Sequence, residues 1–360
     1  MIINIHKKYL LKKFTKKIFL ISNIFLVLVI IINLIEEANF LKDSETTIWT
    51  PVLLTVLNAP SLLYEMFPFI FLISTQFFFI EIYENREINT LRQFGMDNFS
   101  MLKFLSITSL FLGIFIIVLF YNFSSILKNE YLKIKNKYAG DKKYLAVITK
   151  NGIWIKDNLD DGSIIINSDK IENEFLMNAS ITKFDRDFKI QQNIIADKIN
   201  IKDKKWILFD AIVTELENTS KKYDNYTLKS NFDLERISNL FSDLTSLTYF
   251  ELLKLEKDYK SIGYSIDEIN IQKHRFYSLP FLLCIMTIIA TIIMIYNKFN
   301  QNILLNLFIG IFFSVLVYYL SNFSNLLGEN GRLPLILSVW FPLIILIFLS
   351  TIGILKLNEK

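Results

Sequence analysis

The segment FLSITSLFLGIFIIVLFYNFSSIL, residues 104–127, contains no Asp, Glu, Lys or Arg. At about 24 residues it is long enough to cross the apolar core of a bilayer as an α-helix, which takes roughly 20. Four more charge-free segments of this kind occur, at residues 18–35, 276–297, 299–327 and 333–355. A sixth, residues 59–80, is interrupted only by Glu65 and contains Pro60 and Pro68, which predict a kink. The sequence therefore predicts six transmembrane helices, with spans at about 18–38, 59–81, 99–127, 276–296, 301–324 and 333–356.

The composition indicates a membrane protein with a large polar part. Of the 360 residues 52% are hydrophobic, and the mean hydropathy is +0.37, yet 21% are charged. A net charge of +4, with basic residues that are not confined to one cluster, argues against a nucleic-acid partner. Cys284 is the only cysteine, and His6 and His274 are the only histidines, so we expect no disulfide and no metal site. The Gly-x-x-x-x-Gly-Lys pattern that cradles phosphates does not occur.

Lysines indicate how the predicted spans are oriented. Six of them precede the first span, Lys7, Lys8, Lys12, Lys13, Lys16 and Lys17, and Lys356 and Lys360 follow the last. Because basic segments stay in the cytoplasm, both termini and the connection at 82–98 are expected there, with residues 128–275 outside. A cleaved signal peptide is the alternative reading of the basic start. The apolar run is long for one, however, and no small-residue cleavage site follows it.

Residues 128–275 contain no span, and their pattern changes from apolar runs to alternation. Short stretches rich in β-branched and aromatic residues occur at 179–184, 196–201, 205–213 and 226–228. Such stretches, separated by turn residues, predict strands. We predict a helical membrane protein of three plus three spans, residues 1–127 and 276–360, with an inserted all-β, jelly-roll-like domain at 128–247. A helical connector is expected at 248–275.

The connection at 82–98 has the pattern of an amphipathic helix over residues 83–96. Ile88, Leu91 and Phe94 recur at a spacing of three, Gly95 suits a helix C-cap, and Asp97 or Asn98 suits the cap of the next helix. A short helix across the membrane face is what an ABC transporter uses to dock on its ATPase. An ordinary amphipathic linker is the alternative interpretation.

The stretch from Glu87 to Gly95, EINTLRQFG, resembles the coupling helix of the LptF/LptG (YjgP/YjgQ) permeases, the membrane subunits of the bacterial lipopolysaccharide export ABC transporter. That family also has three spans, a periplasmic jelly roll and three more spans. Further local matches are Pro60 with Pro68, Trp206-x-Leu208, Arg275 with Pro280, and Leu333-Pro334 with Trp340-x-Pro342. The last of these favours LptG over LptF.

The resemblance implies a non-catalytic subunit of the bacterial inner membrane without a cofactor of its own. It would extract lipopolysaccharide and pass it to a periplasmic bridge. Its partners would be an LptF-like or LptG-like paired permease, an LptB-like ATPase dimer, and an LptC-like single-span protein with a β jelly roll. Glu87 would contact the ATPase, with Leu91, Arg92 and Gly95 completing the coupling helix.

Lipid-contact residues cannot be transferred from the family, because its basic positions are not matched. Glu36, Glu37 and Ser61 occupy them here. The candidates that remain are Lys42, the acid Glu65 within the second span, and Arg332. The alternative, purely structural interpretations are that Glu65 reaches water at the outer surface and that Arg332 caps a loop.

Two other functions compete with export. A secondary, ion-coupled transporter would need ionisable groups at the membrane midplane and repeated halves, whereas these spans are nearly charge-free and show no repeat. A membrane-anchored periplasmic binding or sensor protein would need only one anchor.

Overall fold

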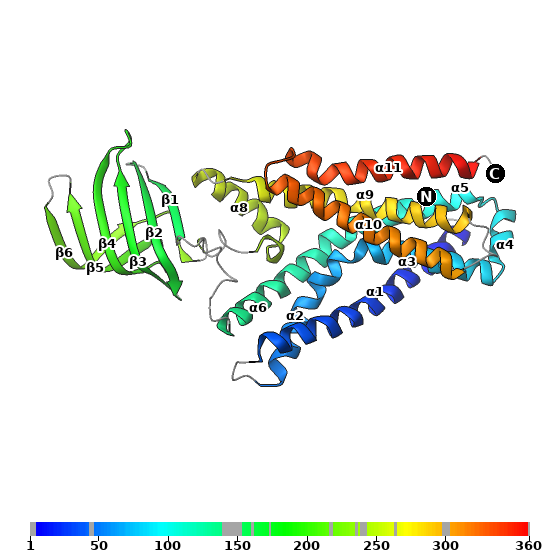
Figure 1. Ribbon diagram of the computed structural model, residues 1–360, viewed down its shortest axis with the longest axis horizontal. Helices are drawn as coiled ribbons and strands as arrows, with labels where there is room; N and C mark the ends of the chain where they lie inside the picture. Colours follow the sequence, from blue (N-terminus) through cyan, green and yellow to red (C-terminus); the bar gives the residue numbers. More distant parts are fainter. Residues whose placement is uncertain are drawn as a thin grey trace. The chain divides into compact units, whose positions relative to one another are not determined.

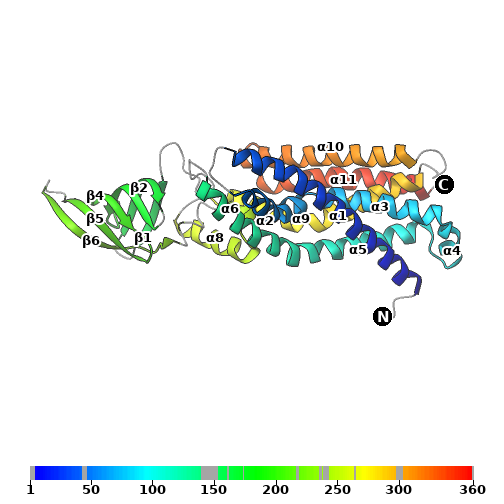
Figure 2. The same ribbon diagram turned by 90° about the horizontal axis from the view of Figure 1, so that it is seen from below.

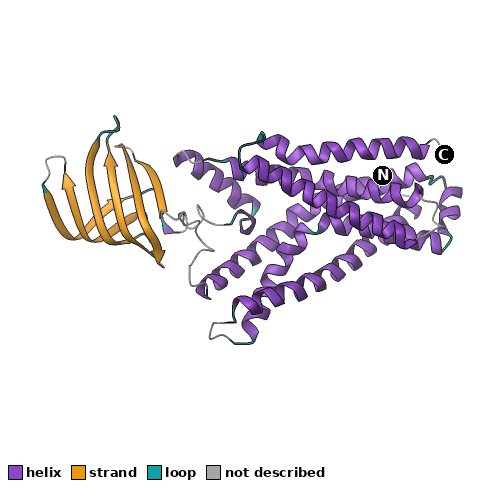
Figure 3. Ribbon diagram, in the orientation of Figure 1, coloured by secondary structure: helices purple, strands orange, loops and turns teal. Residues whose placement is uncertain are grey.

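A computed structural model describes residues 5–42, 47–138, 153–159, 162–172, 174–215, 219–234, 237, 243–262, 265–296 and 303–358. The chain forms two compact units (Figures 1 and 3). The helical unit comprises Met1–Tyr131 and Asp267–Lys360, and the sheet unit comprises Leu132–Ile266. Residues 139–152, which belong to the predicted β domain, lie outside the described residues.

The helical unit is built from long apolar helices and a few shorter ones. They are α1 (Ile5–Phe40), α2 (Trp49–Glu65), α3 (Phe67–Glu84), α4 (Glu87–Gln93), α5 (Asn98–Phe115), the π-helix η1 (Ile116–Tyr121), α6 (Asn122–Tyr138), α9 (Asp267–Tyr296), α10 (Ile303–Glu329) and α11 (Leu335–Asn358). Within the described residues, six helical stretches are long and apolar enough to cross a membrane, the number that the sequence predicts. These are Ile5–Phe40, Phe67–Glu84, Asn98–Tyr138, Asp267–Ile295, Ile303–Gly328 and Leu335–Lys356.

The helices extend beyond the charge-free segments from which the spans were predicted. α1 begins at Ile5 rather than near residue 18, and α9 begins at Asp267 rather than at 276. The reason is that a charged residue ends an apolar run without ending a helix, and lysine is a good helix former. The second span departs further from its prediction, because two helices, α2 and α3, replace the single kinked helix that was expected. Its predicted kink is a break at Met66 between α2 and α3, next to Pro68, which has no N–H to donate.

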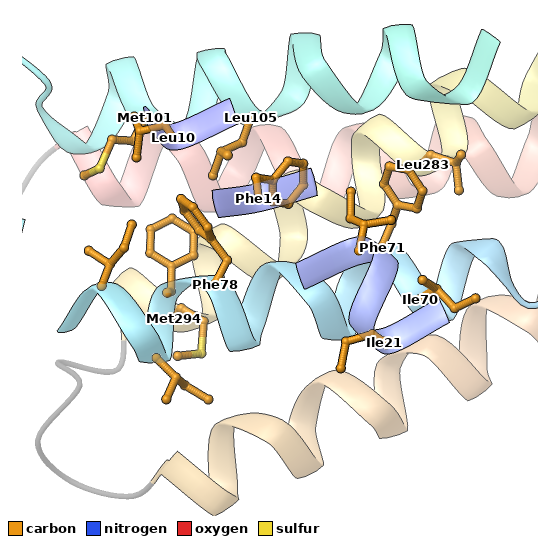
Figure 4. Packing of buried hydrophobic residues seen from close by; sticks show 14 of the residues in the cluster. Leu10, Phe14, Ile21, Ile70, Phe71, Phe78, Met101, Leu105, Leu283 and Met294 are labelled. Atoms are coloured by element: carbon orange, nitrogen blue, oxygen red, sulfur yellow. The ribbon is translucent and has the colours of Figure 1, made fainter. Parts of the chain in front are cut away.

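The core of the helical unit lies around α3. Most of its buried side chains come from α1, α3, α5 and α9, and Figure 4 labels Leu10, Phe14 and Ile21 of α1, Ile70, Phe71 and Phe78 of α3, Met101 and Leu105 of α5, and Leu283 and Met294 of α9. Most of the apolar part of α3 and of α9 is buried, whereas only about a fifth of that of α1 and α10 is buried. A helix that is apolar on all sides and buried, as α3 is, belongs in the centre of a bundle.

Small and polar residues let the helices approach closely. A Cβ on Gly113 of α5 would lie 2.7 Å from the Cα of Pro280 in α9. Beside this contact the hydroxyls of Ser109 and Thr287 lie 2.7 Å apart. Gln76 of α3 donates from Nε2 to the carbonyl oxygen of Asn306 in α10 at 2.7 Å. Contacts of this type hold helices together where an apolar surround removes the hydrophobic driving force.

The sheet unit contains one six-stranded antiparallel sheet in sequential order. Its strands are β1 (Ile153–Leu159), β2 (Gly162–Glu172), β3 (Phe175–Phe184), β4 (Ile190–Asn200), β5 (Lys205–Glu215) and β6 (Ser220–Lys229). The short helix η2 (Leu244–Ser246) and α8 (Tyr249–Ile262) follow. Among the described strands there is a single sheet in meander order, so the sequence is right about an all-β domain but a jelly roll is not confirmed.

One face of the sheet carries an apolar row, and the sheet curves (Figure 1). Successive cross-strand partners in this row are Ile155, Ile166, Ile181, Ile194 and Val213, all buried. The segment after β6 returns to β1, where the buried Asp157 accepts hydrogen bonds from Ser230 and Asn231. Trp206 donates to the carbonyl of Phe232 at 2.8 Å. The segment after β6 is therefore hydrogen-bonded to β1 and β5, while β1 and β6 stay the two edges of an open sheet.

Candidate functional site

The connection between α3 and α5 contains the predicted coupling residues. α3 ends at Glu84, Arg86 takes a left-handed conformation with φ 57°, and α4 then runs for seven residues from Glu87 to Gln93. The helix predicted over 83–96 is thus shorter and preceded by a turn, because a left-handed residue cannot continue a right-handed helix. Figures 1 and 2 place α4 at the end of the helical unit that also holds both chain termini.

Local sequence signals set the end of α4. Gly95, with φ 78°, donates its N–H to the carbonyl of Arg92, and Met96 donates to that of Leu91, both at 2.9 Å. This pair of bonds is a Schellman motif, and Leu91 and Met96 supply its buried apolar contact. Asp97 caps α5 by accepting from the N–H of Ser100 at 3.1 Å, and hydrogen bonds from Ser100 hold the pKa of Asp97 below its ordinary value. Both caps follow the sequence prediction.

α4 has one buried and one exposed side. Ile88 and Leu91 are buried, as their spacing predicts. Phe94 does not share their side, since the helix ends one residue earlier. It is 58% exposed and stacks on the ring of His6, with centroids 4.4 Å apart. The residues of α4 exposed to solvent are Asn89, Thr90, Arg92 and Gln93. A partner would therefore meet a mostly polar surface.

Glu87 is held by lysine from α1. The Nζ of Lys13 lies 2.8 Å and 2.7 Å from the two carboxylate oxygens of Glu87 and 3.2 Å from Oε1 of Glu81. Lys17 pairs with the other oxygen of Glu81. We call these four residues the lysine clamp. Sequence reasoning treated both lysines only as a signal of orientation. One sequence signal could have indicated a buried, paired lysine: Lys13 is next to Phe14, on the side of α1 that is buried.

A fully buried acid, Glu37, lies near the other end of α1. Glu37 has no exposed surface, and its Oε1 accepts from the hydroxyl of Tyr131 in α6 at 2.7 Å. Nearby, the amide of Asn58 in α2 donates to Asn33 at 3.4 Å. The sequence marked Glu37 only as a departure from the family's basic positions. In the structure, Glu37 forms a contact between α1 and α6.

The three candidate lipid contacts lie on three different elements. Lys42 is exposed in the turn after α1, Glu65 is exposed at the last residue of α2, and Arg332 is exposed in the turn after α10. By contrast, Glu87, Leu91, Arg92 and Gly95 lie together on α4 and its cap. In the described parts of the chain, no group of three or more His, Cys, Asp or Glu residues is placed to hold a metal ion.

Comparison with protein families decides the assignment. The model of the lipopolysaccharide export system permease LptF/LptG matches residues 8–356, nearly the whole chain. The chain belongs to the LptF/LptG permease family. A comparison with curated proteins gave no match. As an LptF/LptG permease it is a multi-pass inner-membrane subunit of lipopolysaccharide export, and its family membership implies a paired permease and an ATPase as partners.

Proposed function

We propose that this LptF/LptG permease is the LptG-type subunit and that α4 is its ATPase-coupling helix. It would extract lipopolysaccharide from the inner membrane and pass it to a periplasmic bridge, while an LptB-like ATPase dimer on separate chains hydrolyses ATP. Both termini and α4 would be cytoplasmic, and the sheet unit periplasmic. The observation that carries the proposal is α4 itself, a short helix capped at its C-terminal end, with its apolar side buried and its polar side exposed.

The sheet unit supports the second half of this role. Its buried apolar row offers a surface suited to acyl chains, and in an open sheet an unpaired edge strand can extend into a neighbouring sheet. We propose that it acts as the jelly-roll-like domain that hands lipid to an LptC-like partner. The 3+3 division of spans around this insertion would leave the helical unit to pair with an LptF-like permease.

Docking on α4 can be tested by crosslinking. In a Cys284→Ser background, Thr90→Cys places a single thiol on the exposed side of α4, and Lys222→Cys places one on β6 as the matched control. A reagent with a maleimide at one end and a photoactivated group at the other should join Thr90→Cys, but not Lys222→Cys, to the ATPase that co-purifies. Absence of any ATPase from the purified complex, together with transport driven by a proton gradient, would contradict the proposal.

Lipid passage over the sheet can be tested by photo-crosslinking. Val213 and Ile212 are neighbours on β5, the first buried in the apolar row and the second 42% exposed. A photoreactive side chain at Val213 should capture lipopolysaccharide in the working complex, and one at Ile212 should capture little. Equal capture at both positions would show that lipid does not pass preferentially along the face of the sheet that carries the apolar row.

A further inference from the structure

The side of the sheet that carries the apolar row, its inner side, also contains a buried acid, Asp157. This residue is 1% exposed and follows Ile155 by two positions on β1, so the two side chains share one face of the strand. Its Oδ2 accepts from the hydroxyl of Ser230 and from the backbone N–H of Asn231, both at 2.8 Å. Its Oδ1 accepts from the side-chain amide of Asn231 at 2.9 Å. These donors compensate the carboxylate for the water that it has lost on burial.

The donors belong to residues Ser230–Phe232, which follow β6 and which we call the strap. The strap is also attached on the side of β5. The N–H of Ser230 donates to the carbonyl of Lys204 at 2.8 Å, and the indole of Trp206 donates to the carbonyl of Phe232 at 2.8 Å. Trp206 lies on the buried side of β5, and neither Trp206 nor Phe232 has exposed surface. The strap therefore runs from the start of β5 to β1 across the inner side of the open sheet.

The strap lies outside the pairing of the strands. It begins after Lys229, the last residue of β6, so its release would leave the six-stranded ladder intact. Asn231 is exposed to solvent, whereas Ser230 and Phe232 on either side of it are buried. Release would break the hydrogen bonds to Asp157 and would expose Phe232. A segment held by a few contacts at the surface can open locally while the rest of the domain stays folded.

An acyl chain on the inner side of the sheet would compete with the strap for the same surface. Ile155, at the β1 end of the apolar row, is two residues from the carboxylate that holds the strap. Burial of an acyl chain there would replace the burial that Phe232 has in the closed arrangement. Lipid would therefore bind the open arrangement better than the closed one, which is the condition for a ligand to shift such an equilibrium.

We propose that the strap is a gate on the lipid route over the sheet, and that Asp157 is a positioning residue that holds the gate closed. This inference rests on the proposed function, because it takes passage of lipid along the apolar row as its starting point. In the closed state Asp157 binds the strap, and Phe232 covers part of the inner side. An arriving acyl chain displaces the strap, and the hydrogen bonds to Asp157 form again after the chain has left.

A reversible lock tests the gate in the complete transporter, with its paired permease and ATPase, reconstituted in vesicles that contain lipopolysaccharide. In a Cys284→Ser background, Asp157→Cys with Ser230→Cys can form a disulfide between β1 and the strap, because the side chains that they replace are in contact. Thr214→Cys with Ser220→Cys is the matched control. Their hydroxyls lie 3.2 Å apart, at the end of β5 and the start of β6, whereas the strap follows the end of β6.

Two quantities are measured before and after reduction, the ATP-dependent release of lipopolysaccharide and its capture by a photoreactive side chain at Ile181 in the apolar row. We expect the oxidised lock to lower both about tenfold and reduction to restore them, because a covalent link removes the open state. The control disulfide should leave both unchanged. A strap with only a structural role would tolerate the lock, so full release and capture by the oxidised form would overturn the proposal.

A second measurement uses the wild-type chain and covers the case in which the double variant does not fold. In the closed state the N–H groups of Asn231 and Phe232 donate to Asp157 and Ser230. Hydrogen exchange of a peptide that contains the strap should therefore rise about threefold or more when ATP is added to the complex with lipopolysaccharide. Unchanged protection in a complex that releases lipid would contradict the gate. A wild-type complex that neither binds an ATPase nor releases lipid would instead defeat the proposed function, so the two failures are distinguishable.

Discussion

The two ends of α1 are attached to the rest of the helical unit by different chemistry. At Lys13 the contact is ionic, joins three helices, and uses carboxylates whose side chains keep exposures of 33% at Glu81 and 24% at Glu87. At Glu37 a carboxylate without exposed surface accepts a short hydrogen bond from Tyr131. Between the two ends α1 exposes large apolar side chains, among them Phe19, Ile24, Val27 and Ile31.

This difference separates a contact that can rearrange from one that cannot. Ion pairs within reach of solvent are screened by salt and contribute modestly to stability. A fully buried polar group has no water to replace a lost partner, so its contact is kept or the local structure fails. We therefore expect α1 to pivot at its Glu37 end and to move at its Lys13 end. Breaking each end in turn tests that expectation.

The largest effect is expected for Glu37→Ala. The change leaves the hydroxyl of the buried Tyr131 without its acceptor and opens a cavity, so we expect a loss of about 2–4 kcal/mol in the free energy of unfolding. Thermal unfolding of the purified permease measures it. Glu36→Ala, at the exposed neighbour, is the control, and equal losses for the two variants would contradict the assignment of a buried anchor.

A smaller loss, about 1.5 kcal/mol, is expected for Tyr131→Phe. Only the hydroxyl is removed, so there is no large cavity, but Glu37 loses a donor at a buried site. Tyr138→Phe removes the same atom from an exposed side chain of α6 and should change stability little. The two unfolding transitions are compared directly. A Tyr131→Phe variant as stable as wild type would mean that this end of α1 is not fixed by the bond.

The smallest loss in stability, about 1 kcal/mol, is expected for Lys13→Met, because solvent screens the partly exposed carboxylates. The distinguishing measurement is the salt dependence. Raising the ionic strength from 0.1 M to 1 M shortens the screening length from about 10 Å to about 3 Å, so the difference between wild type and Lys13→Met should narrow. The difference in stability between wild type and Glu37→Ala should be the same at both ionic strengths. Salt effects of the same size at both ends would remove the contrast between them.

Part of the fold could be predicted because it depends on local pattern. The charge-free segments locate six spans, since a bilayer imposes a minimum length on an apolar helix. The caps at Gly95 and Asp97 were also predictable, because each joins atoms only a few residues apart. The exposure of the Phe94 side chain could not be predicted, because it depends on α4 ending at Gln93.

The sequence alone was sufficient for the class of protein, a helical membrane chain with an inserted β domain, and for the presence of a short helix between α3 and α5. Apolar length and strand alternation are properties of consecutive residues, and a bilayer or a half-buried sheet selects for them directly. Only the tertiary structure decided what Glu87 touches. Lys13 lies 74 residues away in the chain, and the two meet because α1 packs against α3 and α4. No local sequence period predicts that contact, because it depends on two charged groups from distant parts of the chain whose attraction offsets the cost of removing them from water.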